Sequence, residues 1–187
     1  MKLIMATHNI NKVKEVKAIL NKDNIISLTD LNDFKEIEET GNTFFENATI
    51  KALEIAKKYN EVAIADDSGI VIKALNGAPG LYSVRYSGKG DLENNLLVLK
   101  QLETVKDRSA YFISVIALAY PDGKVLKFEG KWEGKIGFEI KGNQGFGYDS
   151  IFIPNGYEIT AGELNSKEKN QISHRYQALM KLNEYLK

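Results

Sequence analysis

A run of hydrogen-bond donors lies near the N-terminus, where a short apolar stretch gives way to a helical pattern. The run is Thr7-His8-Asn9-Ile10-Asn11-Lys12. Backbone N–H groups at a helix start attract anions, and the Thr7 hydroxyl, the Asn9 amide and the Lys12 ammonium would add three side-chain donors. The segment is therefore a candidate phosphate site, although an asparagine-rich helix cap explains the same residues. The Walker spacing occurs nowhere in the chain, which disfavours a P-loop NTPase.

Two acidic segments could supply carboxylates for metal binding or for general acid–base catalysis. Ala65-Asp66-Asp67-Ser68-Gly69 ends an apolar run, and Glu38 lies in an acidic stretch. Because side chains alternate along a strand, Asp66 and Asp67 should face opposite ways, so that one enters a site and the other braces the scaffold. Carboxylates brought together raise one another's pKa unless a cation lies between them, so a cluster with Glu38 and Asp67 suits Mg²⁺ or Mn²⁺. A solvated turn and a helix-dipole partner are the structural alternatives.

Glycines, aromatic rings and basic side chains gather in two later segments. In Gly145-Phe146-Gly147-Tyr148-Asp149 the glycines allow close backbone approach, and the flat ring of Phe146 suits a nucleobase. Lys169, His174 and Arg175 lie near the start of the last helical pattern and would donate hydrogen bonds to an electron-rich ligand edge. A glycine-kinked hairpin with core aromatics, and a histidine satisfied within the fold, explain the same residues structurally.

Composition narrows the chemistry further. The chain has 187 residues, of which 43% are hydrophobic, and 25 basic side chains balance 25 acidic ones. Zero net charge gives no field that would draw the chain onto polymeric nucleic acid or an anionic membrane, so an anionic ligand needs a local site. With no cysteine and two histidines, thiol chemistry and Cys- or His-rich metal sites are excluded, which leaves a hard, oxygen-ligated metal. No apolar run approaches the roughly 20 residues of a spanning helix, so we expect a soluble, cytoplasmic protein.

Strand and helix patterns alternate in the first half of the chain and then give way to a hairpin. This order predicts an α/β fold with a mixed sheet, and the length predicts a single domain over residues 1–187. We expect strands at residues 2–6, 25–28, 62–65, 70–74, 110–120 and 125–129, and helices at about 13–20, 43–59, 91–102 and towards the C-terminus. The pattern of the third helix is carried by Leu92, Leu96, Leu99 and Leu102.

Taken together, these segments resemble the inosine/xanthosine triphosphate pyrophosphatases, a Ham1-like family that hydrolyses non-standard purine nucleoside triphosphates. The matching motifs occur in the family order and run nearly end to end. They are T-H-N-I-N-K at residues 7–12, E-E-T-G-N-T-F-F-E-N-A at 38–48 followed by Lys51, A-D-D-S-G-I at 65–70, G-A-P-G-L-Y-S-V-R-Y at 77–86, G-F-G-Y-D at 145–149 and E-K-N-Q-I-S-H-R at 168–175. His8 and Asn11 stand where the family commonly has glycine, and Ser150 where it usually has proline.

The resemblance implies an elongated mixed sheet flanked by helices, with two lobes, a central cleft and a homodimer. It assigns the triphosphate to residues 7–12 and a substrate contact to Ser68. It gives Mg²⁺, with Mn²⁺ as a substitute, to Glu38 and Asp67, and it makes Asp67 the proton acceptor. The implied reaction converts ITP, dITP or XTP to the nucleoside monophosphate and pyrophosphate. The residues implied to line the nucleoside pocket are Phe146, Gly147, Tyr148, Asp149, Lys169, His174 and Arg175.

Two other functions remain open from the sequence. A non-catalytic module that binds or senses purine nucleotides would use the same phosphate and base segments, but it would not need Lys12, Glu38 and Asp67 together. A glycosidase with a carboxylate pair would suit the acidic and aromatic residues, yet it leaves residues 7–12 unexplained. Metal-dependent turnover separates the pyrophosphatase from the sensing module.

Overall fold

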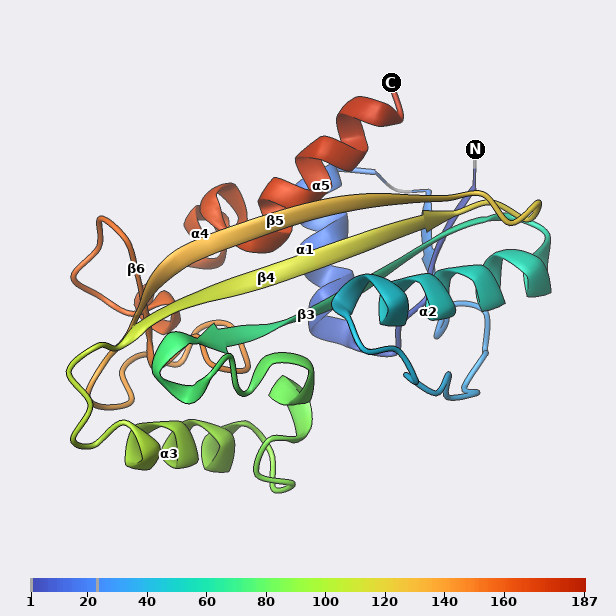
Figure 1. Cartoon of the computed structure of the whole chain (residues 1–187). Coiled ribbons are helices and arrows are strands. Elements are labelled where there is room, and N and C mark those ends of the chain that lie inside the picture. Colours follow the sequence, from blue (N-terminus) through green and yellow to red (C-terminus); the bar gives the residue numbers. More distant parts are fainter. Residues whose placement is uncertain (1, 23) are drawn as a thin grey trace. The chain divides into compact units, whose positions relative to one another are not determined.

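The computed structural model describes residues 2–22 and 24–187, and it has the predicted α/β architecture with a mixed sheet. The strands are β1 (Leu3–Met5), β2 (Ile25–Ser27), β3 (Val62–Ile72), β4 (Ser109–Ala119), β5 (Val125–Ile136) and β6 (Phe152–Pro154). The α-helices are α1 (Ile10–Leu20), α2 (Phe44–Tyr59), α3 (Asp91–Gln101), α4 (Ser166–Ile172) and α5 (His174–Tyr185) (Figure 1). Short 3₁₀ helices lie at Lys73–Leu75 (η1), Gly80–Arg85 (η2) and Ala161–Glu163 (η3).

The sheet has the strand order β2-β1-β3-β4-β5-β6 and contains both kinds of pairing. β1 pairs in parallel with β2 and β3, whereas β5 pairs antiparallel with β6. The neighbouring strands β4 and β5 are joined by a tight turn in which the Tyr120 N–H donates to the Lys124 carbonyl at 2.9 Å. This turn confirms the predicted hairpin.

β3 is one continuous strand where the sequence pattern predicts two strands separated by a turn. Extended backbone runs from Val62 to Ile72, straight through the segment Asp66-Asp67-Ser68-Gly69, so the prediction of a break was wrong. Polar side chains inside a buried strand need hydrogen-bond or charge partners. Helices distant in sequence supply these partners, and their side chains build the site described below.

The chain folds as two compact units. The first holds the described residues up to Asp67, together with Ser114–Gly130 and Arg175–Lys187, and the second holds Ser68–Ile113 and Lys131–His174. β3, β4 and β5 contribute residues to both units. The single domain over residues 1–187 and the central cleft stay predictions.

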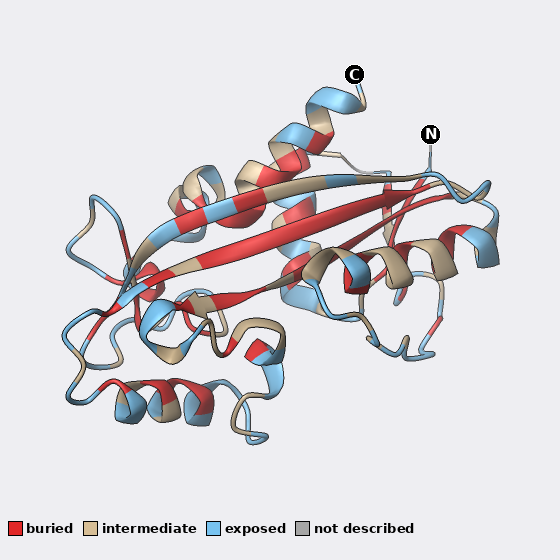
Figure 2. Ribbon diagram, in the orientation of Figure 1, coloured by how far each residue is buried: buried red, intermediate tan, exposed pale blue. Residues whose placement is uncertain are grey.

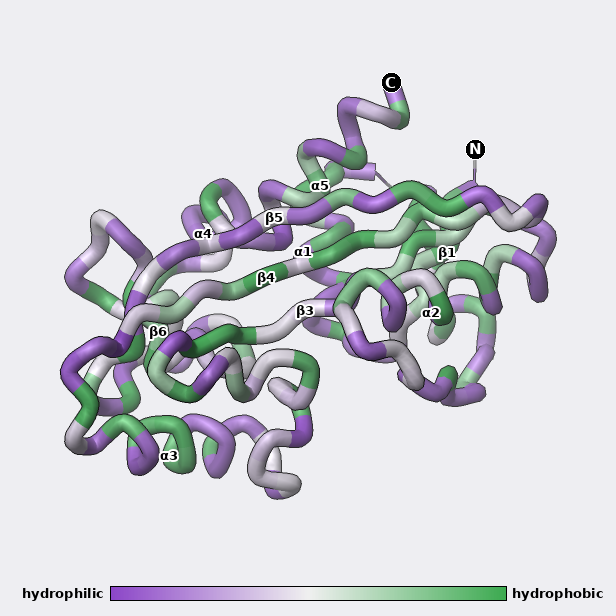
Figure 3. The backbone as a smooth tube through the Cα atoms, in the orientation of Figure 1, coloured by the Kyte–Doolittle hydropathy of each residue, from purple (hydrophilic) through white to green (hydrophobic). Residues whose placement is uncertain are grey.

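In the first unit, β3 and β4 carry large side chains on one face and mostly alanines on the other. Ile64 and Ile116 pack with α1 and α5, whereas Ala63 and Ala117 pack against Ala52 and its neighbours on α2. This division follows from the alternation of side chains along a strand. The alanines leave room for α2 to lie close to the sheet, because protein cores are close-packed. Figure 2 shows that β4 is buried over most of its length, and Figure 3 shows that it is correspondingly hydrophobic.

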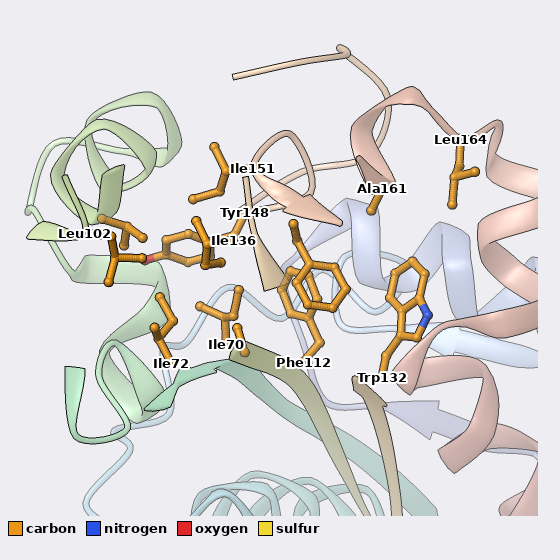
Figure 4. Packing of buried hydrophobic residues seen from close by; sticks show 13 residues of the cluster. Ile70, Ile72, Leu102, Phe112, Trp132, Ile136, Tyr148, Ile151, Ala161 and Leu164 are labelled. Carbon is orange, nitrogen blue, oxygen red and sulfur yellow. The ribbon is translucent and has the colours of Figure 1, made fainter. Parts of the chain in front are cut away.

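The core of the second unit is rich in aromatic side chains. The ring centroids of Phe112 and Phe152 lie 4.7 Å apart in an edge-to-face arrangement, and those of Trp132 and Phe152 lie 5.4 Å apart. Such pairs stabilise a core beyond their buried area. Tyr148 belongs to the same cluster and lies beside Ile136 (Figure 4). The glycine-rich segment is thereby anchored to the core through one of its own aromatic residues.

α3 buries asparagines, and two of the leucines that carry its pattern face solvent. Leu92 and Leu96 are 60% and 45% exposed, whereas Asn94 and Asn95 are 1% and 3% exposed. Loops that pack against α3 form hydrogen bonds with these amides, which compensate for the burial of Asn94 and, through the Nδ2 group, for part of the burial of Asn95. Among the described residues, no helix combines the length and the apolar content needed to cross a bilayer.

Candidate functional site

The segment Thr7 to Lys12 follows β1 and forms a short loop and the first turn of α1, so it lies between a strand and a helix as predicted. Asn9 is the N-cap of α1, and its Oδ1 accepts from the N–H groups of Asn11 and Lys12 at 3.0 and 3.2 Å. The Thr7 hydroxyl accepts from the Asn9 N–H at 3.1 Å. The capping alternative is thus observed directly. Phosphate binding by the same segment stays a prediction, to which the exposed Asn11 and the half-buried Thr7 offer no obstacle.

His8 and Ile10, the other two residues of this segment, face away from the core. Ile10 is 62% exposed, and the His8 Nε2 lies 2.8 Å from the carbonyl oxygen of Asp33. Asp33 is in turn held by the Lys58 ammonium at 2.7 Å and by the Tyr59 hydroxyl at 2.8 Å. The histidine that replaces the usual glycine therefore ties this loop to the segment that precedes α2.

Asp66 is the centre of a buried ion-pair network on the α1 and α5 side of β3. Its Oδ2 lies 2.8 Å from the Lys12 Nζ and 3.2 Å from an Arg175 Nη, and its Oδ1 accepts from the Ser114 hydroxyl at 2.5 Å. Arg175 also pairs with Glu15. Burial alone would raise the pKa of Asp66, but the charges of Arg175 and Lys12 outweigh it and hold that pKa well below its usual range.

Asp67 faces the opposite side of β3, towards α2, which confirms the predicted divergence of the two carboxylates. Its Oδ1 lies 3.6 Å from the Lys51 Nζ, which also bonds Glu39 at 2.5 Å and the Asp66 carbonyl oxygen at 3.2 Å. Burial raises the pKa of Asp67, Lys51 and Lys12 oppose this effect, and the nearby carboxylates of Glu39 and Asp66 add to it. Asp67 thus has a largely buried side chain, which is 12% exposed, and a pKa above that of an ordinary aspartate.

Lys51→Met is expected to raise the pKa of Asp67 further. The substitution keeps the length of the side chain but removes the positive charge that favours the ionised carboxylate. The measurement is a pH titration of the Asp67 carboxyl carbon by NMR in the wild type and in the variant. Lys57→Met, an exposed change on the same helix, is the matched control and should leave the titration unchanged. A midpoint in Lys51→Met equal to or below the wild-type midpoint would contradict this electrostatic account.

Glu38, the other predicted metal ligand, is exposed, and its neighbour Glu39 is the carboxylate that contacts Lys51. Within the described ranges, no three side chains of the metal-binding types His, Asp and Glu form a group that could hold an ion by themselves. Mg²⁺ sites commonly use one or two carboxylates and complete their shell with water and substrate phosphates. The metal assignment to Glu38 and Asp67 stays a prediction.

The predicted nucleoside-binding residues of the second unit centre on Asp149. Its Oδ2 accepts from the Phe146 N–H at 2.9 Å and from the Lys169 ammonium at 2.6 Å, and both charged side chains are 4% exposed. The Lys169 Nζ lies 4.9 Å from the centre of the Phe146 ring. Tyr148 donates to the Ser83 carbonyl at 2.7 Å, and burial raises the pKa of its hydroxyl. The structure therefore brings the G-F-G-Y-D segment and Lys169 together.

His174 and Arg175 are adjacent in the chain but belong to different units. The His174 ring is 4% exposed and stacks on Phe112 at a centroid distance of 4.8 Å and an interplanar angle of 11°. The Arg175 side chain is 1% exposed and is engaged by Glu15 and Asp66. Donation by either residue to a purine stays a prediction, as does the substrate contact of the half-buried Ser68.

Comparison with known proteins decides the family. The model of the Ham1 family matches residues 3–185, nearly the whole chain. This chain belongs to the Ham1 family. The fold agrees, because the Ham1 protein of Staphylococcus aureus superposes with a TM-score of 0.90 at 39% identity and covers 100% of this chain and 98% of its own. A HAM1 protein from Coxiella burnetii gives the same TM-score at 45% identity, with the same coverage.

Curated relatives of this Ham1-family chain carry a more specific name. A dITP/XTP pyrophosphatase of Acholeplasma laidlawii is 49% identical over 180 residues, which cover 96% of this chain and 90% of the relative. A dITP/XTP pyrophosphatase of Halalkalibacterium halodurans is 48% identical and covers 98% of this chain and 97% of its own length.

Glu15 and Ser114 were not singled out from the sequence, and Glu39 and Lys51 were named only as members of a matching motif, without a role of their own. Helical spacing offered one signal, because Glu15 lies three residues after Lys12 on α1 and hence on the same face. No such signal in the sequence pointed to Ser114. This residue lies on β4, and its contact with Asp66 depends on β3 and β4 being neighbours in the sheet.

Proposed function

We propose that this chain hydrolyses dITP, ITP and XTP to the nucleoside monophosphate and pyrophosphate. The observation that carries the proposal is the division between two adjacent carboxylates of β3. Asp66 is paired with cations inside the fold, whereas burial raises the pKa of Asp67 although Lys51 and Lys12 oppose the shift. The names of the Acholeplasma and Halalkalibacterium relatives support the substrate class.

The triphosphate is assigned to the loop and first turn formed by residues 7–12. The start of α1 directs backbone N–H groups and the positive end of the helix dipole towards an anion. Lys12 contributes a positive charge that neutralises phosphate oxygens. Its ammonium is held by Asp66 at 2.8 Å, so that its position is fixed before substrate arrives. Such pre-organisation matters because positioning and charge stabilisation dominate phosphoryl transfer.

Asp67 is assigned as the general base. A water molecule attacks the α-phosphorus, its proton passes to the Asp67 carboxylate, and the bond from the α-phosphorus to the bridging oxygen breaks so that pyrophosphate leaves. A base works best when its pKa lies near the working pH, and burial moves the pKa of Asp67 in that direction. Lys51 limits the shift, because its positive charge favours the ionised carboxylate.

Mg²⁺, with Mn²⁺ as a substitute, fits the chemistry of the donors on this side of β3. Burial raises the pKa of Asp67 and the neighbouring carboxylates add to the shift, and a bound cation would favour the ionised form against both effects. Asp67 and Glu38 would hold the ion, and substrate phosphates would complete its oxygen shell. When bound, the ion would neutralise charge on the phosphate oxygens.

The nucleoside is assigned to the second unit, where Phe146 can present its ring to a base and Lys169 and Asp149 form a buried pair of donor and acceptor. A site built around hydrogen bonds to a purine oxygen rejects analogues that lack it by about 10⁴-fold, because its buried polar groups are left unpaired. This mechanism accounts for a preference for hypoxanthine and xanthine over adenine.

Incubation of the purified protein with ITP, XTP, dITP, GTP and ATP, with and without Mg²⁺, tests the proposed reaction. We expect metal-dependent release of pyrophosphate from ITP, XTP and dITP, and little from ATP. Release of orthophosphate would place cleavage at the γ-phosphate and contradict the proposed chemistry. Tight binding of ITP without turnover would instead support the sensing module.

The family resemblance also supports a homodimer as the working assembly. Sedimentation equilibrium at several protein concentrations tests it, and a mass of one chain throughout would exclude it. The residues assigned to phosphate and to the general base all come from one chain, so the proposed chemistry does not depend on this outcome.

A further inference from the structure

The N-terminal half of α3 holds the backbone of the glycine-rich segment. The Asp91 Oδ2 accepts from the Gly147 N–H at 2.8 Å, and the Asn95 Nδ2 donates to the Gly147 carbonyl at 2.9 Å. Asn95 also donates to the Ser150 hydroxyl at 3.3 Å. Asp91 and Asn95 are four residues apart and therefore lie on the same face of the helix. Both polar backbone groups of one glycine are thus held by a single helix.

The hydrogen bonds from α3 restrain a segment whose glycine backbone could otherwise adopt several conformations. Gly145 and Gly147 have φ values of +74° and +63°, and glycine has little intrinsic preference among such conformations. Phe146 lies between these two glycines, so the direction of its ring depends on how they are held. The bonds from α3 fix the second glycine, and Asp149 fixes the Phe146 N–H at 2.9 Å.

Burying Asn95 costs free energy, and an asparagine at this position is explained by the hydrogen bonds that its amide donates. It is 3% exposed, and in the part of the chain that the structure describes its Oδ1 has no hydrogen-bond partner. A buried acceptor without a partner destabilises a fold, and an apolar side chain would fill the same place without that cost. What the asparagine adds is the pair of hydrogen bonds that its amide donates to Gly147 and Ser150.

The adjacent Asn94 holds a second loop from the same helix. Its Oδ1 accepts from the N–H and the hydroxyl of Ser87 at 2.7 Å each, and its Nδ2 donates to the carbonyls of Ser83 and Val84 at 3.3 and 3.1 Å. The Ser83 carbonyl also accepts from the Tyr148 hydroxyl. Ser83 belongs to the motif at residues 77–86. This motif therefore supports the glycine-rich segment through the hydroxyl of Tyr148.

We propose that Asp91 and Asn95 are positioning residues that hold the G-F-G segment in its nucleoside-binding conformation. They set the affinity for the nucleoside part of the substrate and leave the binding of its phosphates unaffected, because the residues assigned to phosphate lie in the other unit. This inference rests on the proposed function, in which Phe146 and its neighbours bind the nucleoside.

Asp91→Ala tests the inference, because Asp91 is exposed and its loss should not prevent folding. We expect the KM for ITP to rise about tenfold, the usual effect of losing a hydrogen bond to a charged group, with kcat changed by less than about twofold. The inhibition constant of inorganic tripolyphosphate, which has no base, should stay unchanged. Asp91→Asn keeps an acceptor oxygen for the Gly147 N–H and should restore most of the affinity.

Glu93→Ala is the matched control, since Glu93 is also an exposed acid in the first turn of α3. Equal KM values for Asp91→Ala and Glu93→Ala would overturn the inference, as would an equal weakening of ITP and tripolyphosphate. Asn95→Asp provides a second test, because a carboxylate cannot donate to the Gly147 carbonyl, and it should also raise the KM for ITP selectively. A wild-type protein that does not hydrolyse ITP would overturn the proposed function, and the affinity for IMP would then test the α3 contacts separately.

Discussion

Asp67→Asn is expected to lower kcat for ITP hydrolysis by about 10²–10⁴-fold, the usual contribution of a general base. Asparagine has almost the same shape as aspartate but cannot accept the proton of the attacking water. Stopped assays of pyrophosphate release measure the change. Binding of ITP, followed by calorimetry under conditions without turnover, should change little, because residues 7–12 and the second unit retain their donors.

Asp122→Asn is the control for this substitution, because Asp122 is exposed in the turn between β4 and β5. It should turn over ITP at the wild-type rate. A kcat of Asp67→Asn within a few-fold of the wild type would remove Asp67 as the base. We expect kcat/KM of the wild type to fall as the pH drops through the raised pKa of Asp67, and the residual activity of the variant should lack this acid limb.

The order of the elements was largely predictable, because most of them have either an amphipathic pattern of one clear period or, as in β4, a continuous apolar run. The helix from Phe44 to Tyr59 and the strand from Ser109 to Ala119 lie within one residue of their predicted bounds. The helix begins with Thr43 and Glu46, whose side chains form a capping box and mark its start in the sequence. Local signals of this kind need no knowledge of the rest of the fold.

β3 could not be predicted as one strand, because the stability of its middle depends on partners that are distant in sequence. Asp66 is compensated by Lys12 from α1 and Arg175 from α5, and Asp67 by Lys51 from α2. In the sequence, Asp-Asp-Ser-Gly has the composition of a turn. α3 differs from its pattern for the same reason, since Asn94 and Asn95 are buried by loops that return to them.

The residue types of the candidate site could be predicted, whereas the contacts between them could not. Alternation along β3 was enough to separate Asp66 from Asp67. It did not reveal that Arg175, expected to face a purine, is engaged by Glu15 and Asp66. A contact between residues 160 positions apart follows from tertiary packing, and a motif records only that an arginine is present.

Asp66→Ala is expected to lower the free energy of unfolding by about 3–5 kcal/mol, the cost of removing one partner from a buried ion pair. Lys12 and Arg175 would lose the carboxylate between them while remaining almost fully buried. Urea denaturation at neutral pH measures the loss. Glu54→Ala, which removes the acid of the exposed pair with Lys35, should change stability little.

The effect of Asp66→Ala should also depend on pH in a defined direction. The folded-state pKa of Asp66 lies below its unfolded value, so its ionised form contributes stability that is complete above the unfolded pKa of about 3.9 and is lost as the pH falls through the folded pKa. The difference in the free energy of unfolding between wild type and variant should therefore shrink on acidification.

Combining Arg175→Met with Asp66→Ala should lower the free energy of unfolding by less than the sum of the two single changes, because the double variant leaves one buried charge fewer without a partner. Strict additivity, or a difference that does not shrink at low pH, would show that Asp66 stabilises the fold by packing and not by its charge.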